Sequence, residues 1–189
     1  FSSDKLTVVK GAASVQYGSD AIGGVVITEP VELPREGPMS GEVRGLGMLN
    51  GRGIGGNALL QGGVKGRNGF GWRVQGSGRS LGDSRAAEYN LSNTGMHEAG
   101  ASAALGYRDH RWSASGYASW YARELGILRA AHIGNLTDLQ NAINNGEPWH
   151  IADHTREIDA PRQTVDHLLA KAEAGYAVNE RGRVVLTYG

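Results

Sequence analysis

The sequence lacks cysteine, any excess of charge and any long apolar run, and each absence excludes a class of protein. Without cysteine, the 189-residue chain has no disulfide framework, zinc ribbon or thiol nucleophile. Its 19 Lys and Arg balance its 19 Asp and Glu, which argues against a nucleic-acid partner, because binding nucleic acid needs a basic stripe. No run approaches the ~18–20 apolar residues of a membrane-spanning helix. The mean hydropathy of −0.35 still allows a transmembrane β-barrel, whose alternation signal is weak in each strand.

Catalytic constellations are missing as well. No nucleophile–base pair or metal-ligand cluster stands at a spacing typical of an enzyme, so we expect no catalytic residue, no resident cofactor and no metal site. His150 and His154 lie four residues apart, the spacing of two metal ligands on a helix. Pro148 just before them argues against a helix, and two solvated loop histidines are the simpler interpretation.

Glycine is abundant instead, at 30 residues, without a collagen-like period. From Ser40 onward, apolar or small residues alternate with polar ones, as in β-strands with two different faces. Trp72 and Val74, for example, alternate with Arg73 and Gln75. The pattern predicts an all-β fold with about seven antiparallel strands. Their expected ranges are 40–50, 56–65, 71–81, 97–108, 112–123, 162–176 and 183–189.

The connections between these segments alternate in length. After the first hairpin they are short (66–70), long (82–95), short (108–111), very long (124–161) and short (179–182). Outer-membrane barrels combine short periplasmic turns with longer extracellular loops, whereas a soluble sandwich has no reason to lengthen every second connection. Inside the longest connection, 135–145 has helical period, Thr137 and Gln140 have capping-box spacing, and Gly146 with Pro148 ends the predicted short helix.

Trp112 and Trp120 share one predicted face, and their spacing separates them by ~26 Å along a strand. With a strand tilt near ~40°, this projects to about 20 Å, comparable with the apolar band of roughly 25 Å that aromatic girdles border in outer-membrane barrels. The alternative is a pair of core tryptophans in a soluble sandwich. The small residues between them would underfill such a core, so the spacing favours a membrane face.

The N-terminal stretch 6–28 contains two apolar, β-branched runs, at 6–9 and 25–28, that predict strands on either side of a glycine-rich segment. Residues 12–16 suit one helical turn, and residues 17–20 suit a tight turn. Gly23-Gly24 allows close backbone approach before the second strand. The segment therefore predicts a compact strand–turn–strand unit.

This stretch resembles the closing segment of the plug domain in TonB-dependent outer-membrane receptors. The shared features are a basic residue and a glycine after an apolar strand, then Tyr-Gly-Ser, then Ala-Ile-Gly-Gly before a Val/Ile-rich strand. They are carried in this sequence by Lys10, Gly11, Tyr17, Gly18, Ser19, Ala21, Ile22, Gly23 and Gly24. The family more often has Arg where Lys10 stands and often Pro where Ala12 stands. The alternative is a soluble β-domain with a glycine-rich hairpin.

The resemblance implies a plugged transmembrane β-barrel of about 22 strands, of which this chain supplies the plug's end and the first strands. We expect residues 1–29 to belong to the plug, 30–39 to be a linker rich in proline and charge, and 40–189 to form barrel strands, with the short helix in an extracellular loop. Seven strands alone leave two open edges, which lipid does not tolerate, so we expect a piece of a longer protein. The polar-face residues expected to contact the plug or line a wet lumen are Arg73, Arg79, Lys171 and Glu173.

For function, the resemblance implies TonB-dependent import of an iron chelate across the bacterial outer membrane, with a ferric siderophore first and haem or cobalamin as rarer cargo. The implied partners are the chelate, membrane lipid and TonB of the inner-membrane TonB–ExbB–ExbD complex, which in this family binds a segment upstream of the plug. Candidate ligand contacts are Arg85, Glu88, Tyr89, His132, His150 and His154. Two other classes stay open: a non-transporting structural or adhesive outer-membrane β-protein, and a soluble all-β binding module.

Overall fold

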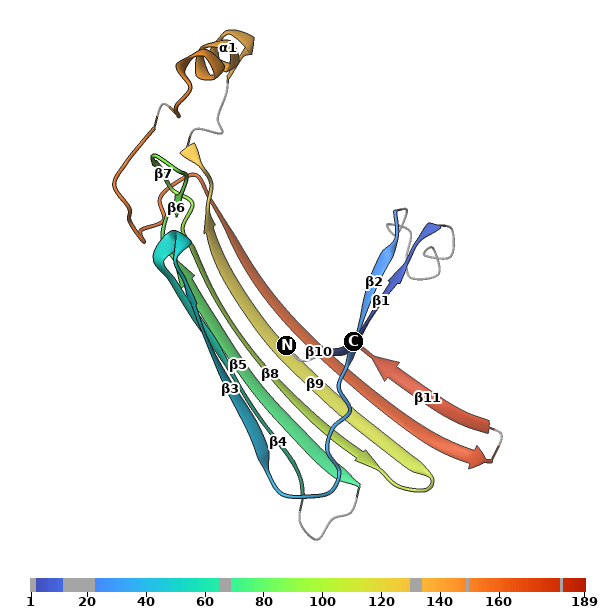
Figure 1. Cartoon of the computed structure of the whole chain (residues 1–189). Coiled ribbons are helices and arrows are strands. Elements are labelled where there is room, and N and C mark those ends of the chain that lie inside the picture. Colours follow the sequence, from blue (N-terminus) through green and yellow to red (C-terminus); the bar gives the residue numbers. More distant parts are fainter. Residues whose placement is uncertain (1–2, 12–22, 65–68, 130–133, 149, 181) are drawn as a thin grey trace.

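The computed structural model describes residues 3–11, 23–64, 69–129, 134–148, 150–180 and 182–189 (Figure 1). Its main feature is a curved, seven-stranded antiparallel sheet with the spatial order β3-β4-β5-β8-β9-β10-β11. These strands are β3 (Ser40–Met48), β4 (Gly53–Gly63), β5 (Phe70–Leu81), β8 (Met96–Arg108), β9 (Trp112–Gly126), β10 (Arg162–Asn179) and β11 (Gly182–Tyr188). The predicted all-β fold is confirmed at this level.

Two small ribbons accompany the sheet. β1 (Ser3–Val9) pairs antiparallel with β2 (Val25–Pro30), and this hairpin stands off the concave side of the sheet (Figure 1). β6 (Ser84–Arg85) pairs with β7 (Asn90–Leu91) inside the connection between β5 and β8. The strands predicted at 6–9 and 25–28 are confirmed, since both lie within the hairpin.

Part of the segment that carries the resemblance lies outside the described residues: the predicted turns at 12–16 and 17–20, with Tyr17, Gly18 and Ser19, and also Ala21 and Ile22. Lys10 and Gly11 follow β1, and Gly23 and Gly24 precede β2. A Cβ atom on Gly24 would lie 2.8 Å from the carbonyl oxygen of Val9, so the expected close approach of backbones occurs there.

Each of the seven predicted segments forms a strand, and the differences lie at the ends. β4 begins at Gly53 instead of 56, because the preceding turn is confined to Asn50–Arg52, a 3₁₀ turn. β9 reaches Gly126 instead of 123, because its end pairs with both β8 and β10. β10 reaches Asn179 instead of 176, because Asn179 still pairs with Gly182 of β11. Pairing on the neighbouring strands, rather than residue preference, sets these ends.

The register gives the sheet two unlike faces. One face, the apolar face, carries large apolar, Ala and Gly side chains across all seven strands. Its large residues include Val43, Leu60, Val74, Leu105, Trp112, Trp120 and Leu168. The other, the polar face, carries Arg44, Asn57, Gln75, Ser102, Ser119 and Lys171 among others. The predicted alternation of faces is therefore confirmed from β3 to β11.

The sheet is a single layer, and large apolar side chains on its apolar face are open. Val43 is 82% exposed, Leu168 79%, Trp112 56% and Trp120 43%. Among the described residues, Met96 is the only buried hydrophobic side chain, at 7% exposure. No second layer of the described chain covers Trp112 or Trp120, as the core of a sandwich would require.

The short turn between β8 and β9 is organised by Asp109. Its Oδ1 accepts hydrogen bonds from the backbone N–H of Arg111 (2.8 Å) and of Trp112 (2.7 Å), and its Oδ2 accepts one from the Tyr107 hydroxyl (2.8 Å). The N–H of Trp112, then that of Arg111 and the Tyr107 hydroxyl, lower the pKa of Asp109 below its usual range. The ionised carboxylate thus stabilises this turn at neutral pH.

The one described α-helix, α1 (Leu136–Asn145), lies in the long connection between β9 and β10, as predicted. Its N-cap is Asn135, whose side chain accepts the N–H of Asp138, so Thr137 does not begin a capping box. Gly146 ends the helix in the left-handed conformation, as expected. No helix in the described part of the chain has the length and apolarity to cross a membrane.

Candidate functional site

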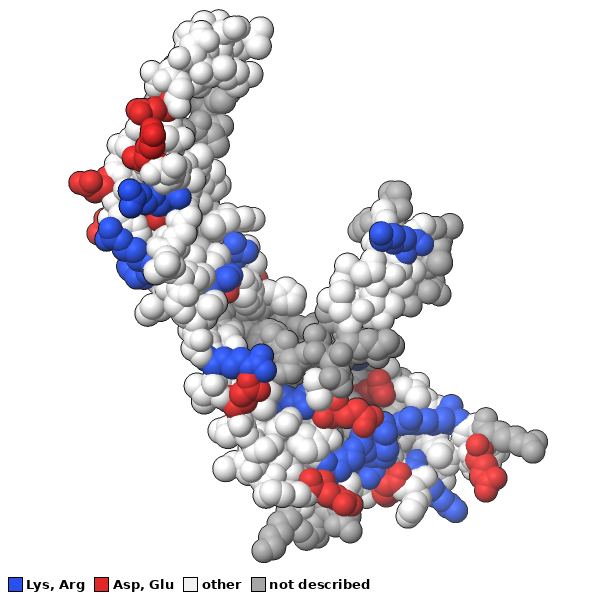
Figure 2. All heavy atoms as spheres, viewed as in Figure 1, with Lys and Arg blue, Asp and Glu red and all other residues white. Residues whose placement is uncertain are grey.

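The two long connections meet at one end of the sheet. The first connection (82–95) joins β5 to β8, and the second connection (127–161) joins β9 to β10 and carries α1. Antiparallel order places both beside the tight turn between β3 and β4, while the short turns lie at the opposite end (Figure 1). Charged side chains gather in two groups, over the short-turn end and around the long connections (Figure 2).

Asp83 holds the two connections together from a buried position. It is 1% exposed, and its Oδ1 accepts the N–H of Thr94 at 2.9 Å. Its Oδ2 accepts the N–H of Thr155 at 3.4 Å, and its own N–H donates to the Thr155 carbonyl oxygen at 2.9 Å. Because these bonds reach across to the second connection, Asp83 fixes Thr155 against the end of β5.

Asn93 closes the base of the second connection. Its Nδ2 donates to the carbonyl oxygens of Ile127 and Pro161, each at 2.9 Å, at the two ends of that connection. Its Oδ1 accepts the N–H of Asp159 at 2.9 Å. Ser92, also buried, donates its hydroxyl to the His150 carbonyl oxygen at 2.9 Å. We call Asp83, Ser92 and Asn93 the loop clasp.

A pocket of about 230 Å³ opens beside the loop clasp. It is lined by Leu49, Gly51, Arg52, Asp83, Arg85, Glu88, Tyr89, Asn90 and His154. Four predicted ligand contacts, Arg85, Glu88, Tyr89 and His154, therefore lie around one cavity although they come from two different connections. Guanidinium, carboxylate, phenol and imidazole groups together offer both hydrogen-bond donors and acceptors to a polar small molecule.

His154 reaches this pocket because the end of β5 has no side chain in its way. Its Nδ1 lies 3.1 Å from the carbonyl oxygen of Asp83. A Cβ atom at Gly82 would lie 2.6 Å from the imidazole Cε1 of His154 and 2.5 Å from the Thr155 carbonyl oxygen. Glycine at position 82 is thus a requirement of this close approach.

The other predicted histidines do not join this pocket. The side chain of His150 is exposed, and the residues from 150 to 154 form no helix, so the helical metal-ligand spacing considered for His150 and His154 is not realised. His132 lies outside the described residues. No group of three or more His, Cys, Asp or Glu in the described part of the chain is arranged to hold a metal ion.

Sequence reasoning missed Asp83, Asn93 and Arg52. A single aspartate and a single asparagine in a polar connection resemble many solvated loop residues, and only their burial marks them as structural. Arg52 belongs to the tight turn after β3, which is remote in sequence from both long connections. Its carbonyl oxygen accepts a hydrogen bond from Arg156 of the second connection. Asp83, Asn93 and Arg52 come together only through the register of the sheet, which a local sequence pattern does not contain.

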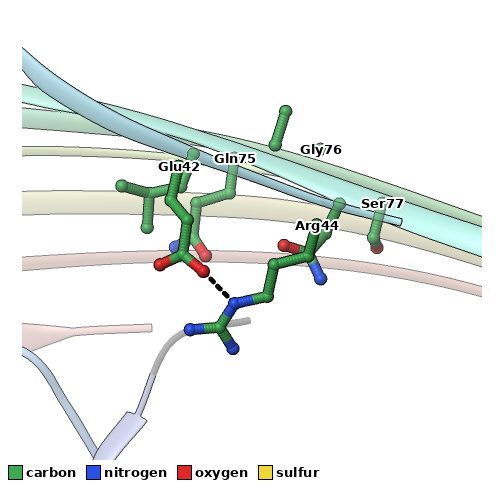
Figure 3. A pocket seen from close by; sticks show the side chains of 8 residues that line it. Glu42, Arg44, Gln75, Gly76 and Ser77 are labelled. Carbon is green, nitrogen blue, oxygen red and sulfur yellow. Dashed lines mark hydrogen bonds and ion pairs between the residues drawn. The ribbon is translucent and has the colours of Figure 1, made fainter. Parts of the chain in front are cut away.

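A second pocket, of about 200 Å³, lies on the polar face near the β3 edge. Glu42 and Arg44 of β3 form an ion pair, and Gln75 and Ser77 of β5 project beside them (Figure 3). Asn57, Ala58, Leu59 and Gly76 complete the lining. The pocket is a hydrogen-bonding groove rather than an apolar cavity.

A row of charged residues crosses the polar face closer to the long connections. Arg79 of β5 pairs with Glu98 of β8 at 2.9 Å, and the Tyr121 hydroxyl donates to the same carboxylate at 3.1 Å. Arg123 of β9 stands opposite Glu98 in the register, and its Nε is buried without a hydrogen-bond partner in the described chain. Within the paired strands, basic residues therefore outnumber acidic ones on this face. The polar face is accordingly suited to contact with anionic groups.

Comparisons with protein-family models, with curated proteins and with solved structures find no match to this chain.

Proposed function

We propose that this chain is part of a TonB-dependent receptor of the bacterial outer membrane that imports an iron chelate. A ferric siderophore is the first choice of cargo, with haem or cobalamin as alternatives. One observation carries the proposal: a single-layer antiparallel sheet has one apolar and one polar face, and its long connections are all at one end. The resemblance of residues 6–28 to the end of a plug domain supports it independently.

Lipid is the partner that best accounts for the apolar face. In water, the exposed Val43, Leu105 and Leu168 would leave a large apolar surface uncovered. In a bilayer the same surface is solvated by acyl chains. Trp112 and Tyr176, whose rings lie 4.6 Å apart near the short turns, suit the interface at one membrane boundary.

The two edge strands of the sheet are the reason to propose a closed barrel. In the described residues, β3 pairs only with β4, and β11 pairs only with β10. An unpaired strand edge is not tolerated in lipid, because its N–H and C=O groups have no water to bind. In the proposed receptor these edges pair with further strands of the same barrel, and the polar face lines a lumen that the plug fills.

Ligand capture is assigned to the pocket between the long connections. Arg52 and Arg85 offer cationic N–H donors for anionic chelate oxygens, Tyr89 offers an aromatic surface, and Glu88 and His154 complete the polar lining. We assign no residue of this chain to TonB, because the family's TonB contact lies upstream of the plug. The pull of TonB would act on the plug, and the hairpin β1–β2 belongs to that unit.

The test is uptake by the full-length receptor in a bacterial strain that lacks its own receptors, with and without TonB. The probes are radiolabelled ferric catecholate, ferric hydroxamate, ferric citrate, haemin and cyanocobalamin. We expect one probe to enter only when TonB is present. The double variant Arg85→Ala/Tyr89→Ala should raise its half-saturating concentration about tenfold, equivalent to ~1.4 kcal/mol.

The matched control is Glu157→Ala, which removes an exposed carboxylate of the second connection that does not line the pocket. Its half-saturating concentration should stay that of the parent protein. Membrane insertion without uptake of any probe would instead favour a structural or adhesive outer-membrane protein. A water-soluble folded protein would favour a binding module and refute the membrane assignment.

A further inference from the structure

Three glycines form a continuous row across the polar face near the short turns. Gly63 of β4 stands opposite Gly71 of β5, and Gly71 stands opposite Gly106 of β8. Side chains on one face of a sheet project as ridges, so a row of three glycines leaves a trough the width of three strands. A backbone can lie in that trough closer to the sheet than any side chain would permit.

The linker between β2 and β3 lies in this trough. A Cβ atom on Gly63 would meet the backbone carbon of Arg35 at 2.8 Å, and one on Gly106 would meet Leu33 Cδ1 at 2.9 Å. A Cβ atom on Gly71 would make the closest approach of the three, to the carbonyl oxygen of Pro34. Each glycine is thus matched to a different, consecutive residue of the linker.

Arg73 fastens the same linker from the side. It is 4% exposed, and its Nη1 and Nη2 donate to the carbonyl oxygens of Val31 (2.8 Å) and Glu32 (2.9 Å). Its Nε donates to Gln61 Oε1 at 2.9 Å, which fixes the plane of the guanidinium. Arg108 adds an ion pair to Glu32 at 3.9 Å. An arginine fork that grips two successive carbonyl groups recognises an extended backbone rather than a particular side chain.

We propose that Gly63, Gly71, Gly106, Arg73 and Gln61 form a linker seat, a built-in binding site for the extended segment 31–35, which stays occupied while the N-terminal hairpin moves. The hairpin itself is not held in this way: its Leu6, Val8 and Val26 are more than half exposed. It also stands away from the sheet (Figure 1). Motion of the hairpin relative to the sheet therefore pivots where β2 ends and the seat begins.

The role of the linker seat in transport rests on the proposed function. Binding of residues 31–35 in the linker seat does not depend on that function. If TonB pulls on the plug, the seat holds the linker and limits the movement to residues before Val31. The barrel strands then bear the load at one defined point, at the short-turn end of the sheet. Without the seat, the linker would lift from the sheet together with the hairpin.

Occupancy is tested by a spin label on Glu36→Cys in the full-length receptor, with any cysteine elsewhere in that receptor replaced; this chain itself contains none. Glu36 is exposed and directly follows the seated residues. We expect a restricted label in the parent, and at least a threefold faster motion in Arg73→Met and in Gly71→Ala. Arg44→Met and Gly116→Ala are the matched controls. Among the described residues, Arg44 forms its ion pair with Glu42 rather than with the linker, and a Cβ on Gly116 meets nothing within 4 Å. A label equally mobile in parent and Arg73→Met overturns the seat.

Permanence is tested by a disulfide between Leu33→Cys and Gly106→Cys. Leu33 Cδ1 lies 2.9 Å from a Cβ built at position 106, so the two cysteines face each other across the contact between linker and sheet. Closure of the bond is checked by the loss of free thiol. We expect the oxidised receptor to transport its cargo within twofold of its reduced form. Loss of uptake on oxidation, regained on reduction, overturns the claim that the linker stays seated. If the parent imports nothing at all, the proposed function fails, and the spin-label result still decides whether the seat exists.

Discussion

Removing the buried carboxylate of Asp83 should release the second connection from the sheet while leaving the strands paired. Asp83→Ala leaves the N–H groups of Thr94 and Thr155 without their acceptor. The substitution leaves the ladder of the sheet intact, because Asp83 follows the end of β5 at Leu81. The expected lesion is therefore local opening, with no global unfolding.

The magnitude follows from the two bonds. A buried donor that loses its acceptor costs about 1–3 kcal/mol. The part-buried N–H of Thr94, bonded at 2.9 Å, is assigned about 2 kcal/mol. The bond to Thr155 at 3.4 Å is long and adds about 1 kcal/mol at most. Relief of the desolvated charge offsets part of this, so we expect a net cost of about 2 kcal/mol in the free energy of local opening. That corresponds to about thirtyfold more opening.

Amide hydrogen exchange in the full-length protein measures this opening directly. Protection at Thr94 and Thr155 should fall about thirtyfold in Asp83→Ala. Asp83→Asn should lose less, because its amide oxygen still accepts one N–H while its NH₂ group faces the other. Asp153→Ala is the control, since Asp153 is exposed in the second connection. Exchange in Asp83→Ala within threefold of the parent, or an equal loss in Asp153→Ala, would refute the reasoning.

Three further predictions concern the faces, the short turn and the end of β5. Leu168→Arg should cost about 2–4 kcal/mol of folding free energy in phospholipid vesicles, measured by urea titration, because it places a charge on the apolar face. Leu169→Arg, on the polar face, should cost less than about 1 kcal/mol. Equal losses in the two variants would contradict the assignment of faces. The pKa of Asp109 is lower in the folded protein, so its stabilisation is present at neutral pH and lost as the pH falls through that folded pKa. Asp109→Ala should therefore lower the thermal midpoint at neutral pH and match the parent below the folded pKa; a difference that persists in acid would be evidence against this turn. Gly82→Ala should expose the second connection to limited proteolysis, because the new Cβ would lie 2.5 Å from the carbonyl oxygen of Thr155. Gly45→Ala is the control, since a Cβ there meets nothing within 4 Å. Equal cleavage of the two variants would mean that the second connection does not pack against Gly82.

The strands could be predicted from the sequence because their signal is local. Alternation with period two needs only a strand and its two environments, and Trp72 to Gln75 display it without reference to any other segment. The helix was recognisable for the same reason, from the spacing of Leu136, Leu139 and Ile143. Strand ends were less accurate, because pairing partners extended β9 and β10 beyond their own pattern.

The sites could be predicted only in part, because they depend on distance in space. Arg85 and Tyr89 were recognisable as members of an exposed polar connection, but nothing in the sequence aligns them with His154. The glycines of the linker seat lie in three separate strands, and their alignment exists only once the register of β4, β5 and β8 is known. Arg73 was expected to contact the plug or line a wet lumen, and its hydrogen bonds to the linker carbonyl oxygens of Val31 and Glu32 could not be read from the sequence.

A sheet one layer thick changes which genetic lesions are severe. Met96 is the only buried hydrophobic residue in the described chain, so burial cannot rank positions by how well they tolerate substitution. The face of the sheet on which a side chain lies decides this instead. Leu168 and Leu169 are neighbours in the chain but lie on opposite faces, so a charged substitution is expected to be severe at Leu168 and mild at Leu169. A single-residue insertion in the middle of β10 would reverse the facing of every later residue in that strand, exchanging both environments at once. One added codon should therefore be more damaging in this strand than most substitutions, whereas the same insertion in the long second connection should be absorbed.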